Sequence, residues 1–447
     1  MKRISVRITC LLLVLFLIIP SLAANASASA YSDGLPDLSG AESVYFANLD
    51  SGKLLAKKDA GGRIAPASTV KIMTGLIAIE HFKDSPDSLV TVTDAMLSAA
   101  SGTSMRLAAG DVLTAYDLIY GVLCGGFNDA AHVLAHAVSG SAGAFVKLMN
   151  DTAKELGMTD TNYVNPTGYD SSAAYTTLND VVILAKNAAE NETYIEISSA
   201  PSKRVSFENG KEDFLMNNRN ALISSYYAYG YVSRYANGII AGMTDLGGYC
   251  VITAPKINDA SYLCIVMGAG EQDGNILSFD IAYKLISYAQ SNLGFLSLMD
   301  AETKICELPV DFALEGSDDD GEYKVSVYTA AEAKAFLPIY TDTESEITYK
   351  YYLYSERLTA PLTSDTWVGG IDFYFEGEIV ATVPLVVGKD VDANTFAISM
   401  DKAKKFITSR TFIISVVSFA VLFGIWFYFF DYKARRRKAN RIRYRNY

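Results

Sequence analysis

The first patterned segment of the chain alternates apolar and polar residues around a short turn. It reads "ESVYFANLDSGKLLAKKDA" and is centred on Asp50, Ser51 and Gly52. Alternation with a period of two is typical of half-buried strands, and small polar residues between two such runs favour a tight turn. We therefore expect an early β-hairpin.

A longer helical pattern follows the hairpin. In "STVKIMTGLIAIEHF" apolar residues cover nearly every side, which predicts a buried helix. From Leu89 to about Ala200, further segments carry apolar residues at i, i+3 and i+4. These segments are "TAYDLIYGVL", "DAAHVLAHAV", "AGAFVKLMNDTAKELG" and "LNDVVILAKNAAE".

Strand patterns return after the helical region. The runs "YCVITAP" and "SYLCIVMGA" are apolar and β-branched, and the helix-like "SFDIAYKLISYAQSNL" closes the region near Leu298. A hairpin, several helices, two strands and a last helix predict an α+β domain over residues 31–298. We expect its helical region to pack on an antiparallel sheet.

The residue composition of the sequence changes after Leu298. "KVSVYTA", "EITYKYYLYSE" and "GGIDFYFEGEIVATVPLVV" are rich in aromatic and β-branched residues and are separated by turn residues. We predict a small all-β domain over residues 299–393. The acidic stretch "EGSDDDGE" within it lacks the spacing of a calcium-binding loop, so we interpret it as a solvated loop.

Both ends of the chain carry membrane-related signals. Basic residues at Lys2, Arg3 and Arg7 precede an apolar run from Cys10 to Ile19, and small residues then offer cleavage sites. This is the pattern of a signal peptide over residues 1–30, cleaved after Ala26, Ala28 or Ala30.

The C-terminal signal is a second apolar segment. Residues 412–430 contain no charged side chain, and nineteen helical residues come close to the ~30 Å hydrocarbon thickness of a bilayer. The tail at 431–447 is strongly basic, and basic flanks stay in the cytoplasm. We predict a juxtamembrane stalk at 394–411, one transmembrane helix at 412–430 and a cytoplasmic C-terminus. The main domains then lie outside the cell membrane.

Composition narrows the function classes. The chain has 447 residues, of which 50% are hydrophobic, so a large core can form. Its formal net charge of −12 argues against nucleic acid as a partner, because phosphate binding needs a basic face. Cys250 and Cys264 lie in apolar strand-like runs, where we expect buried thiols rather than a disulfide framework.

Candidate chemistry starts at the buried helix. If "STVKIMTGLIAIEHF" is helical, Ser68 and Lys71 are i and i+3 neighbours on one face. Desolvation disfavours an ammonium and lowers its pKa, so Lys71 becomes a usable base near neutral pH. A serine hydroxyl within reach of such a base becomes a nucleophile. The spacing alone is a weak signal, because Ser399 and Lys402 repeat it in the polar stalk.

The context of Ser68 resembles a known family. "PASTVKIMTGLIAIE" is similar to the nucleophile helix of the serine D-alanyl-D-alanine carboxypeptidases, the low-molecular-weight penicillin-binding proteins. "TSMRLAAGDVLTAYDLIYGVL", "FNDAA", "YVNPTGYDS" and "NGIIAGMTDLGGYCVITA" resemble further family landmarks between about Ala41 and Gly270. The resemblance implies the β-lactamase/transpeptidase-like fold, followed by a β-domain and a membrane anchor.

The resemblance also implies roles for residues. Ser68 would be the acyl-ester nucleophile, Lys71 its general base, and Asn128 the asparagine that orients substrate and Lys71. Gly242, Met243 and Thr244 would bind substrate, with the backbone amides of Ser68 and Met243 as the oxyanion hole. The implied ligands are peptidoglycan stem peptides and β-lactam antibiotics, with no cofactor and no metal.

Two family motifs are altered in this chain. The serine of the Ser-x-Asn motif falls on Gly126, and Cys124 lies two positions away, where we expect it to point elsewhere. The lysine and threonine of the Lys-Thr-Gly motif fall on Ile240 and Ala241. In the family that lysine helps to hold the substrate's terminal carboxylate. Loss of a charged hydrogen bond of roughly 1.5–3 kcal/mol would cost about ten- to a hundredfold. Arg204, Arg219 and Arg234 are the candidate replacements.

These observations favour a membrane-anchored D-Ala-D-Ala carboxypeptidase that removes the terminal D-Ala through an acyl-enzyme on Ser68. The alternative is a catalytically impaired relative that binds muropeptides or a partner in the cell envelope. A β-lactamase is less favoured, because we find no E-x-x-L-N-like segment for deacylation.

Two other clusters have competing interpretations. His132 and His136 have a zinc-compatible i, i+4 spacing, but without an adjacent Glu or a third ligand we expect packed or surface histidines. The tyrosines of "SSYYAYGYVSRY" either line a groove for glycan or peptide, or form a solvent-facing hairpin with aromatic pairs.

Overall fold

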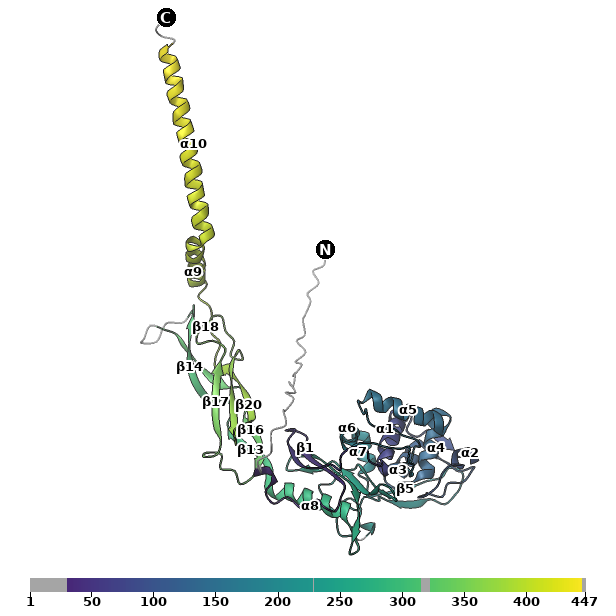
Figure 1. Cartoon of the computed structure of the whole chain (residues 1–447). Helices are drawn as coiled ribbons and strands as arrows, with labels where there is room; N and C mark the ends of the chain where they lie inside the picture. Colours follow the sequence, from purple (N-terminus) through teal and green to yellow (C-terminus); the bar gives the residue numbers. More distant parts are fainter. Residues whose placement is uncertain (1–29, 228, 315–321, 444–447) are drawn as a thin grey trace. The chain divides into compact units, whose positions relative to one another are not determined.

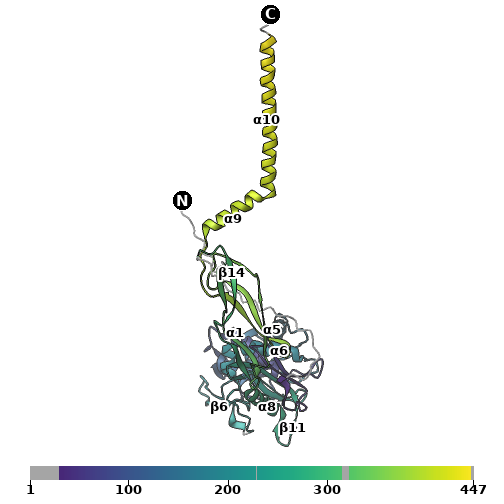
Figure 2. The same ribbon diagram turned by 90° about the vertical axis from the view of Figure 1, so that its left-hand side faces the viewer.

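The computed structural model describes residues 30–227, 229–314 and 322–443 (Figures 1 and 2). Its contacts divide the chain between Gly294 and Phe295 into two compact units. The predicted signal segment before Ala30 lies outside the described residues, as does the acidic stretch at 315–321.

An antiparallel sheet forms the base of the first unit. Strands β1 (Ser43–Asn48) and β2 (Leu54–Lys58) pair with each other, which confirms the predicted hairpin. The strand order is β2-β1-β10-β8-β7. The remaining strands are β7 (Ile240–Thr244), β8 (Gly248–Thr253), β10 (Ala260–Ala269) and β9 (Lys256–Ile257), which pairs with β10. The short strands β11 (Glu271–Gln272) and β12 (Asn275–Ile276) pair beside it.

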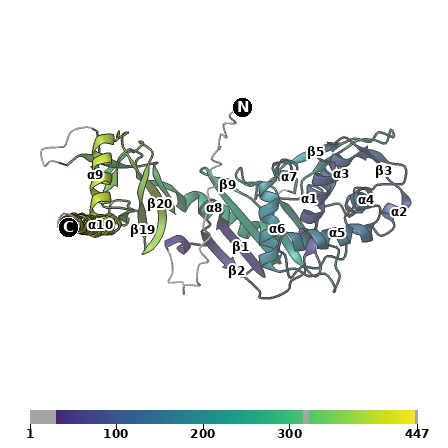
Figure 3. The ribbon, with the colours of Figure 1, turned by 90° about the horizontal axis from the view of Figure 1, so that it is seen from above.

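Helices cover both faces of this sheet (Figures 1 and 3). Helix α8 (Leu277–Asn292) packs on β8 and β10, and the predicted helical region lies on the other side. That region contains α1 (Val70–Phe82), α2 (Asp94–Leu97), α3 (Ala115–Leu123), α4 (Asn128–Ser139), α5 (Ala142–Glu155), α6 (Leu178–Glu190) and α7 (Glu192–Ser198). Short 3-10 turns lie at η1 (Ala30–Ser32), η2 (Ala67–Thr69) and η3 (Ser225–Tyr227). Two small two-stranded sheets consist of β3 (Leu89–Thr91) with β4 (Val112–Thr114) and of β5 (Ser202–Val205) with β6 (Phe214–Asn217).

Local chemistry explains where several of these helices begin. Thr114, Ser141 and Thr177 precede α3, α5 and α6, and each side chain accepts a hydrogen bond from a backbone amide of the first turn. Such caps satisfy amide groups that have no partner inside the helix. Helix α1 has no such side-chain cap, but nearly all of it is buried in the core, as the sequence predicted.

The second unit contains the all-β fold. A sheet has the order β17-β19-β20-β15-β14-β18, and β13 pairs with β16. The strands are β13 (Leu293–Met299), β14 (Lys304–Asp311), β15 (Lys324–Thr329), β16 (Ala333–Pro338), β17 (Thr348–Leu353), β18 (Leu358–Thr359), β19 (Trp367–Phe375) and β20 (Glu378–Val387). Alternate residues of β15, β19 and β20 enter a common apolar core, including Val325, Val327, Ile371, Phe373 and Leu385.

Two helices follow the β-domain. They are α9 (Thr395–Thr408) and α10 (Arg410–Arg443). The segment Arg410–Arg437 is long and apolar enough to cross a membrane, with a mean hydropathy of 2.3, and it is the one such helix in the described ranges. This candidate span contains the apolar segment that the sequence predicted at 412–430.

Candidate active site

Ser68 and Lys71 lie where a tight turn enters α1. Ser68 belongs to the 3-10 turn Ala67–Thr69 and is 6% exposed, and Lys71 in the first turn of α1 is 4% exposed. Ala67 adopts a left-handed backbone conformation with φ of 46°. The loop at Gly168 packs directly on it, since a Cβ on Gly168 would overlap the Ala67 carbonyl oxygen. The serine is therefore held by packing from a distant loop.

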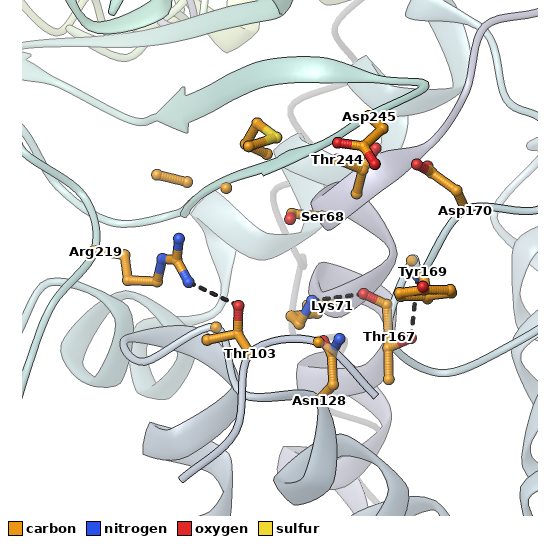
Figure 4. Close-up of a pocket in the computed structure, with 16 residues that line it drawn as sticks. Ser68, Lys71, Thr103, Asn128, Thr167, Tyr169, Asp170, Arg219, Thr244 and Asp245 are labelled. Atoms are coloured by element: carbon orange, nitrogen blue, oxygen red, sulfur yellow. Dashed lines mark hydrogen bonds between the residues drawn. The ribbon is translucent and has the colours of Figure 1, made fainter. Parts of the chain in front are cut away.

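The environment of Lys71 favours the neutral amine. The pKa of Lys71 is lowered from its ordinary value of 10.5 to about 7, mainly by burial and to a smaller extent by the positive charge of Arg219. Lys71 Nζ donates a hydrogen bond of 2.6 Å to the carbonyl oxygen of Thr167. In the described residues no hydrogen bond joins Nζ to Ser68 Oγ, although both side chains face the same cavity (Figure 4).

The partner of Lys71 is positioned by a residue to which sequence reasoning gave no role. Asn165 Oδ1 accepts hydrogen bonds from the Thr167 amide, the Thr167 hydroxyl and the Gly168 amide, at 3.1, 2.9 and 2.7 Å. It thereby folds the "NPTG" segment so that the Thr167 carbonyl points at Lys71. The sequence signal was the resemblance of "YVNPTGYDS" to a family landmark.

Asn128 lines the cavity from the start of α4. Its Nδ2 donates to Ser101 O at 2.6 Å, while Oδ1 is buried and has no hydrogen-bond partner in the described parts of the chain. The neighbouring Asp129 accepts bonds from the Ser104 hydroxyl and from the amides of Met105 and Leu107. This carboxylate ties the loop around Gly102 to α4, and so fixes a second wall of the cavity.

Strand β7 forms the wall opposite Asn128 and carries the predicted Gly242, Met243 and Thr244. All three line the cavity, and Gly242 lies closest to the serine. A Cβ on Gly242 would overlap Ser68 Oγ and approach Ser68 Cβ to 2.5 Å. Only a residue without a side chain lets the strand approach Ser68 this closely.

We expect Gly242→Ala to prevent acylation of Ser68 because its methyl group would occupy the position of Ser68 Oγ. The measurement is the fraction of intact protein that gains the mass of penicillin. Gly143→Ala is the matched control, since a Cβ on Gly143 in α5 meets no atom within 4 Å. Normal acylation of the Gly242→Ala variant would contradict the close approach of β7.

The altered motif positions also lie at or beside the cavity. Ala241 and Gly126 line it, whereas Ile240 is 1% exposed in the apolar core. Of the three candidate arginines, Arg219 lines the cavity; Arg204 in β5 and Arg234 do not. Cys124 points elsewhere, as predicted, because its Sγ donates to Ile197 O at 3.0 Å.

The cavity is polar and electrostatically asymmetric. It has a volume of about 280 Å³, and its charged lining residues are Lys71, Arg219, Asp170 and Asp245. Figure 4 shows Arg219 at one end and the two carboxylates at the other, with Ser68 and Lys71 between them. Such a site can bind a short zwitterionic peptide and present one of its carbonyl groups to Ser68.

The two clusters with competing interpretations lie elsewhere. His132 is buried behind Asn128 on α4, and no group of three potential metal-ligating side chains occurs in the described ranges. The tyrosine-rich segment does not form the predicted hairpin in its described residues: Ser225–Tyr227 make a 3-10 turn, and Tyr229 and Tyr231 pack on Phe279 of α8.

Comparison with known proteins gives consistent matches. Residues 32–271 match the family profile described as D-alanyl-D-alanine carboxypeptidase, and residues 315–393 match that of the penicillin-binding protein 5 C-terminal domain. D-alanyl-D-alanine carboxypeptidase DacF of Bacillus subtilis (strain 168) is 27% identical over 360 residues, covering 78% of this chain and 86% of the relative.

Further relatives extend the similarity. D-alanyl-D-alanine carboxypeptidase DacC of Escherichia coli (strain K12) is 28% identical over 385 residues, covering 84% of this chain and 88% of the relative. The crystal structure of penicillin binding protein 5 from Haemophilus influenzae superposes with a TM-score of 0.57 at 23% identity, covering 80% of this chain and 98% of that one. At that identity the superposition demonstrates a shared fold, which agrees with the fold class predicted from the sequence.

Proposed function

The chain belongs to the peptidase S11 family of D-alanyl-D-alanine carboxypeptidases, and on this premise we propose that it is a membrane-anchored serine hydrolase that removes the terminal D-Ala from peptidoglycan stem peptides. The observation that carries the proposal is the placement of Lys71, a buried amine one helical turn from Ser68 and facing the same cavity. β-Lactam antibiotics are the corresponding covalent ligands.

Acylation begins with the neutral amine of Lys71. As substrate enters, Nζ takes the proton of Ser68 Oγ, and Oγ attacks the carbonyl carbon of the penultimate D-Ala. The backbone amides of Ser68 and Met243 are the proposed donors to the oxyanion. The C–N bond then breaks, the leaving amine takes the proton from Lys71, and free D-Ala departs.

Deacylation reverses the proton movements with water. Lys71 takes a proton from water, which attacks the ester carbonyl, and Ser68 Oγ recovers that proton when the ester bond breaks. Asn128 has one free acceptor, the buried Oδ1, which can accept a hydrogen bond from the protonated Lys71 or from a substrate amide. The proposed role of Asn128 is therefore to hold Lys71 and the substrate in the correct position relative to each other.

The alternative of an impaired, binding-only relative rests on Gly126, Ile240 and Ala241. Nothing in the family match favours it, and the cavity that Gly126 and Ala241 line also contains Arg219, which lies next to Gly126. We therefore propose turnover. The test is release of D-Ala from a pentapeptide ending in D-Ala-D-Ala, together with intact-protein mass spectrometry after penicillin exposure. A protein that released no D-Ala and gained no penicillin mass would overturn the proposal.

We also propose that the enzyme domains lie outside the cell membrane and the basic tail inside it. The helix within Arg410–Arg437 is the candidate span, and Arg435, Arg436 and Arg437 end it on one side. In protoplasts, added protease should degrade the enzyme domains and leave a C-terminal tag protected until the membrane is permeabilised. Cleavage of the tag in intact protoplasts would show the opposite orientation.

A further inference from the structure

The substrate of the proposed reaction ends in a carboxylate, yet the third motif of this chain offers it no cation. Ile240 and Ala241 stand at the lysine and threonine positions, and Ile240 is 1% exposed in the core. Burying a carboxylate without an opposite charge or donor is costly. Another side chain of the cavity must therefore meet the terminal carboxylate.

The cavity leaves only one suitable group among its described lining residues. Asp170 and Asp245 would repel a carboxylate at their end of the cavity. Lys71 must be neutral to act as a base, and its Nζ is engaged by Thr167 O. Arg219 remains, at the end opposite the aspartates, and an arginine keeps its charge at any physiological pH.

Arg219 is held on a rigid backbone. Its amide donates to Cys124 O at 2.9 Å, and the flanking residues Asn218 and Asn220 are each 2% exposed. Asn218 Nδ2 donates to Ser198 O and Ala200 O. Asn220 Nδ2 donates to Gly238 O. Locked neighbours of this kind reduce the entropy lost when the arginine binds a ligand.

The Arg219 guanidinium has more N–H donors than its side-chain hydrogen bond to Thr103 uses. Arg219 Nη1 donates to Thr103 Oγ1 at 3.0 Å, and the described residues provide no carboxylate partner for it. An arginine has five N–H donors in a planar fork that fits a carboxylate. A guanidinium without a carboxylate partner at the lining of a cavity can bind an anion that enters from outside the protein.

The second altered motif supports the same role. Gly126 has φ of 67°, and a Cβ there would lie 3.0 Å from Arg219 Cδ. The serine expected at this position in the family would therefore crowd the stem of Arg219. Gly126 therefore leaves room for the stem of Arg219 in the position that the structure shows.

We propose that Arg219 binds the terminal carboxylate of the substrate and replaces the lysine that this chain lacks at Ile240. This inference rests on the proposed function for the identity of the substrate. It makes Arg219 a specificity-determining residue that distinguishes a free C-terminal acid from a blocked one.

The test compares an N-acyl D-Ala-D-Ala peptide with its C-terminal carboxamide. The wild-type full chain should prefer the acid, and Arg219→Gln should lower kcat/KM for the acid by about 10–100-fold while changing the amide by less than about 3-fold. Loss of Arg219 also changes the charge beside Lys71, but that effect acts on both peptides and cancels in the acid-to-amide ratio. A merely structural role would lower both rates together.

Two control variants test whether the acid preference depends on the positive charge of Arg219 itself. Arg219→Lys keeps a positive charge and should retain part of the acid preference. Arg204→Gln removes an exposed arginine of β5 that does not line the cavity, and it should leave the ratio unchanged. An unchanged ratio in Arg219→Gln would overturn the inference.

A binding measurement separates this inference from the proposed function. In the Ser68→Ala background, calorimetry of the same two peptides should show tighter binding of the acid, and Arg219→Gln should remove that difference. Equal binding of acid and amide by Ser68→Ala with Arg219 intact would overturn the inference. A wild-type protein without D-Ala release and without penicillin adduct would instead overturn the proposed function, and the binding result would still decide the role of Arg219.

Discussion

Replacing Ser68 by alanine is expected to abolish both the penicillin adduct and D-Ala release. The variant removes the oxygen that we propose forms the acyl ester, and loss of a nucleophile typically lowers kcat by about 10³-fold or more. Because Ser68 is buried and small, the fold should survive the change. Intact-protein mass spectrometry after penicillin exposure gives the fraction acylated, and thermal unfolding of the full chain in detergent verifies folding.

The chain contains its own matched control for this experiment. Ser399 and Lys402 in α9 have the same spacing as Ser68 and Lys71, but both are exposed. Ser399→Ala should therefore leave the adduct and the D-Ala release at wild-type levels. An adduct that persists in Ser68→Ala, or disappears in Ser399→Ala, would show that the nucleophile has been assigned to the wrong serine.

The second large effect concerns Lys71. Lys71→Met keeps the length of the side chain and removes the base, so acylation should slow by about 10²–10⁴-fold. With a pKa of about 7 for Lys71, the wild-type acylation rate should rise as pH increases from about 6 to 8, because the amine must be neutral to accept the proton. Pre-steady-state acylation by penicillin across this range measures both effects. A pH-independent rate would contradict the role of Lys71 as base.

The same substitution should stabilise the protein. A pKa lowered from 10.5 to about 7 corresponds to a penalty on the order of 5 kcal/mol below pH 7, since the buried site disfavours the ammonium. Between pH 7 and 10.5 the unfolded chain holds the proton and the folded chain does not, so wild-type stability rises with pH in this window. Lys71→Met lacks this rise, and leaves only Thr167 O without its donor.

Thermal unfolding at two pH values tests this stability difference. Lys71→Met should exceed the wild type most clearly at pH 6.5, and the gap should shrink towards pH 10. A variant that is less stable than the wild type at pH 6.5 would show that Lys71 is not held in a dehydrated site. The expected combination, higher stability with lower activity, is typical of residues kept for function.

Elements with strong short-range periodicity could be predicted from the sequence. The early hairpin appears as β1 and β2, the apolar "STVKIMTGLIAIEHF" segment as a buried turn and α1, and the last helix of the first unit as α8. These features depend on residues within a few positions of each other, so one sequence window contains the information that decides them.

The two Ser-x-x-Lys segments show where a local pattern stops being informative. Both place a serine and a lysine one helical turn apart, yet Lys71 is 4% exposed and Lys402 is exposed. The difference comes from the loop at Thr167, from β7 and from α4, which lie far from Lys71 in the sequence and close it off from water. The same holds for Asn165, whose three hydrogen bonds aim the Thr167 carbonyl at Lys71.

The three candidate arginines show the same difference between what the sequence predicts and what only the folded structure decides. The sequence could name Arg204, Arg219 and Arg234, since each precedes the altered third motif, but it could not rank them. Only the folded chain brings Arg219 to the cavity, through contacts with Cys124, Thr103 and Gly126. The sequence by itself determined the elements and the spacing of Ser68 and Lys71, because these follow from short-range periodicity. The tertiary structure alone decided which lysine is dehydrated and which arginine faces the site, because burial and electrostatics depend on contacts between distant segments.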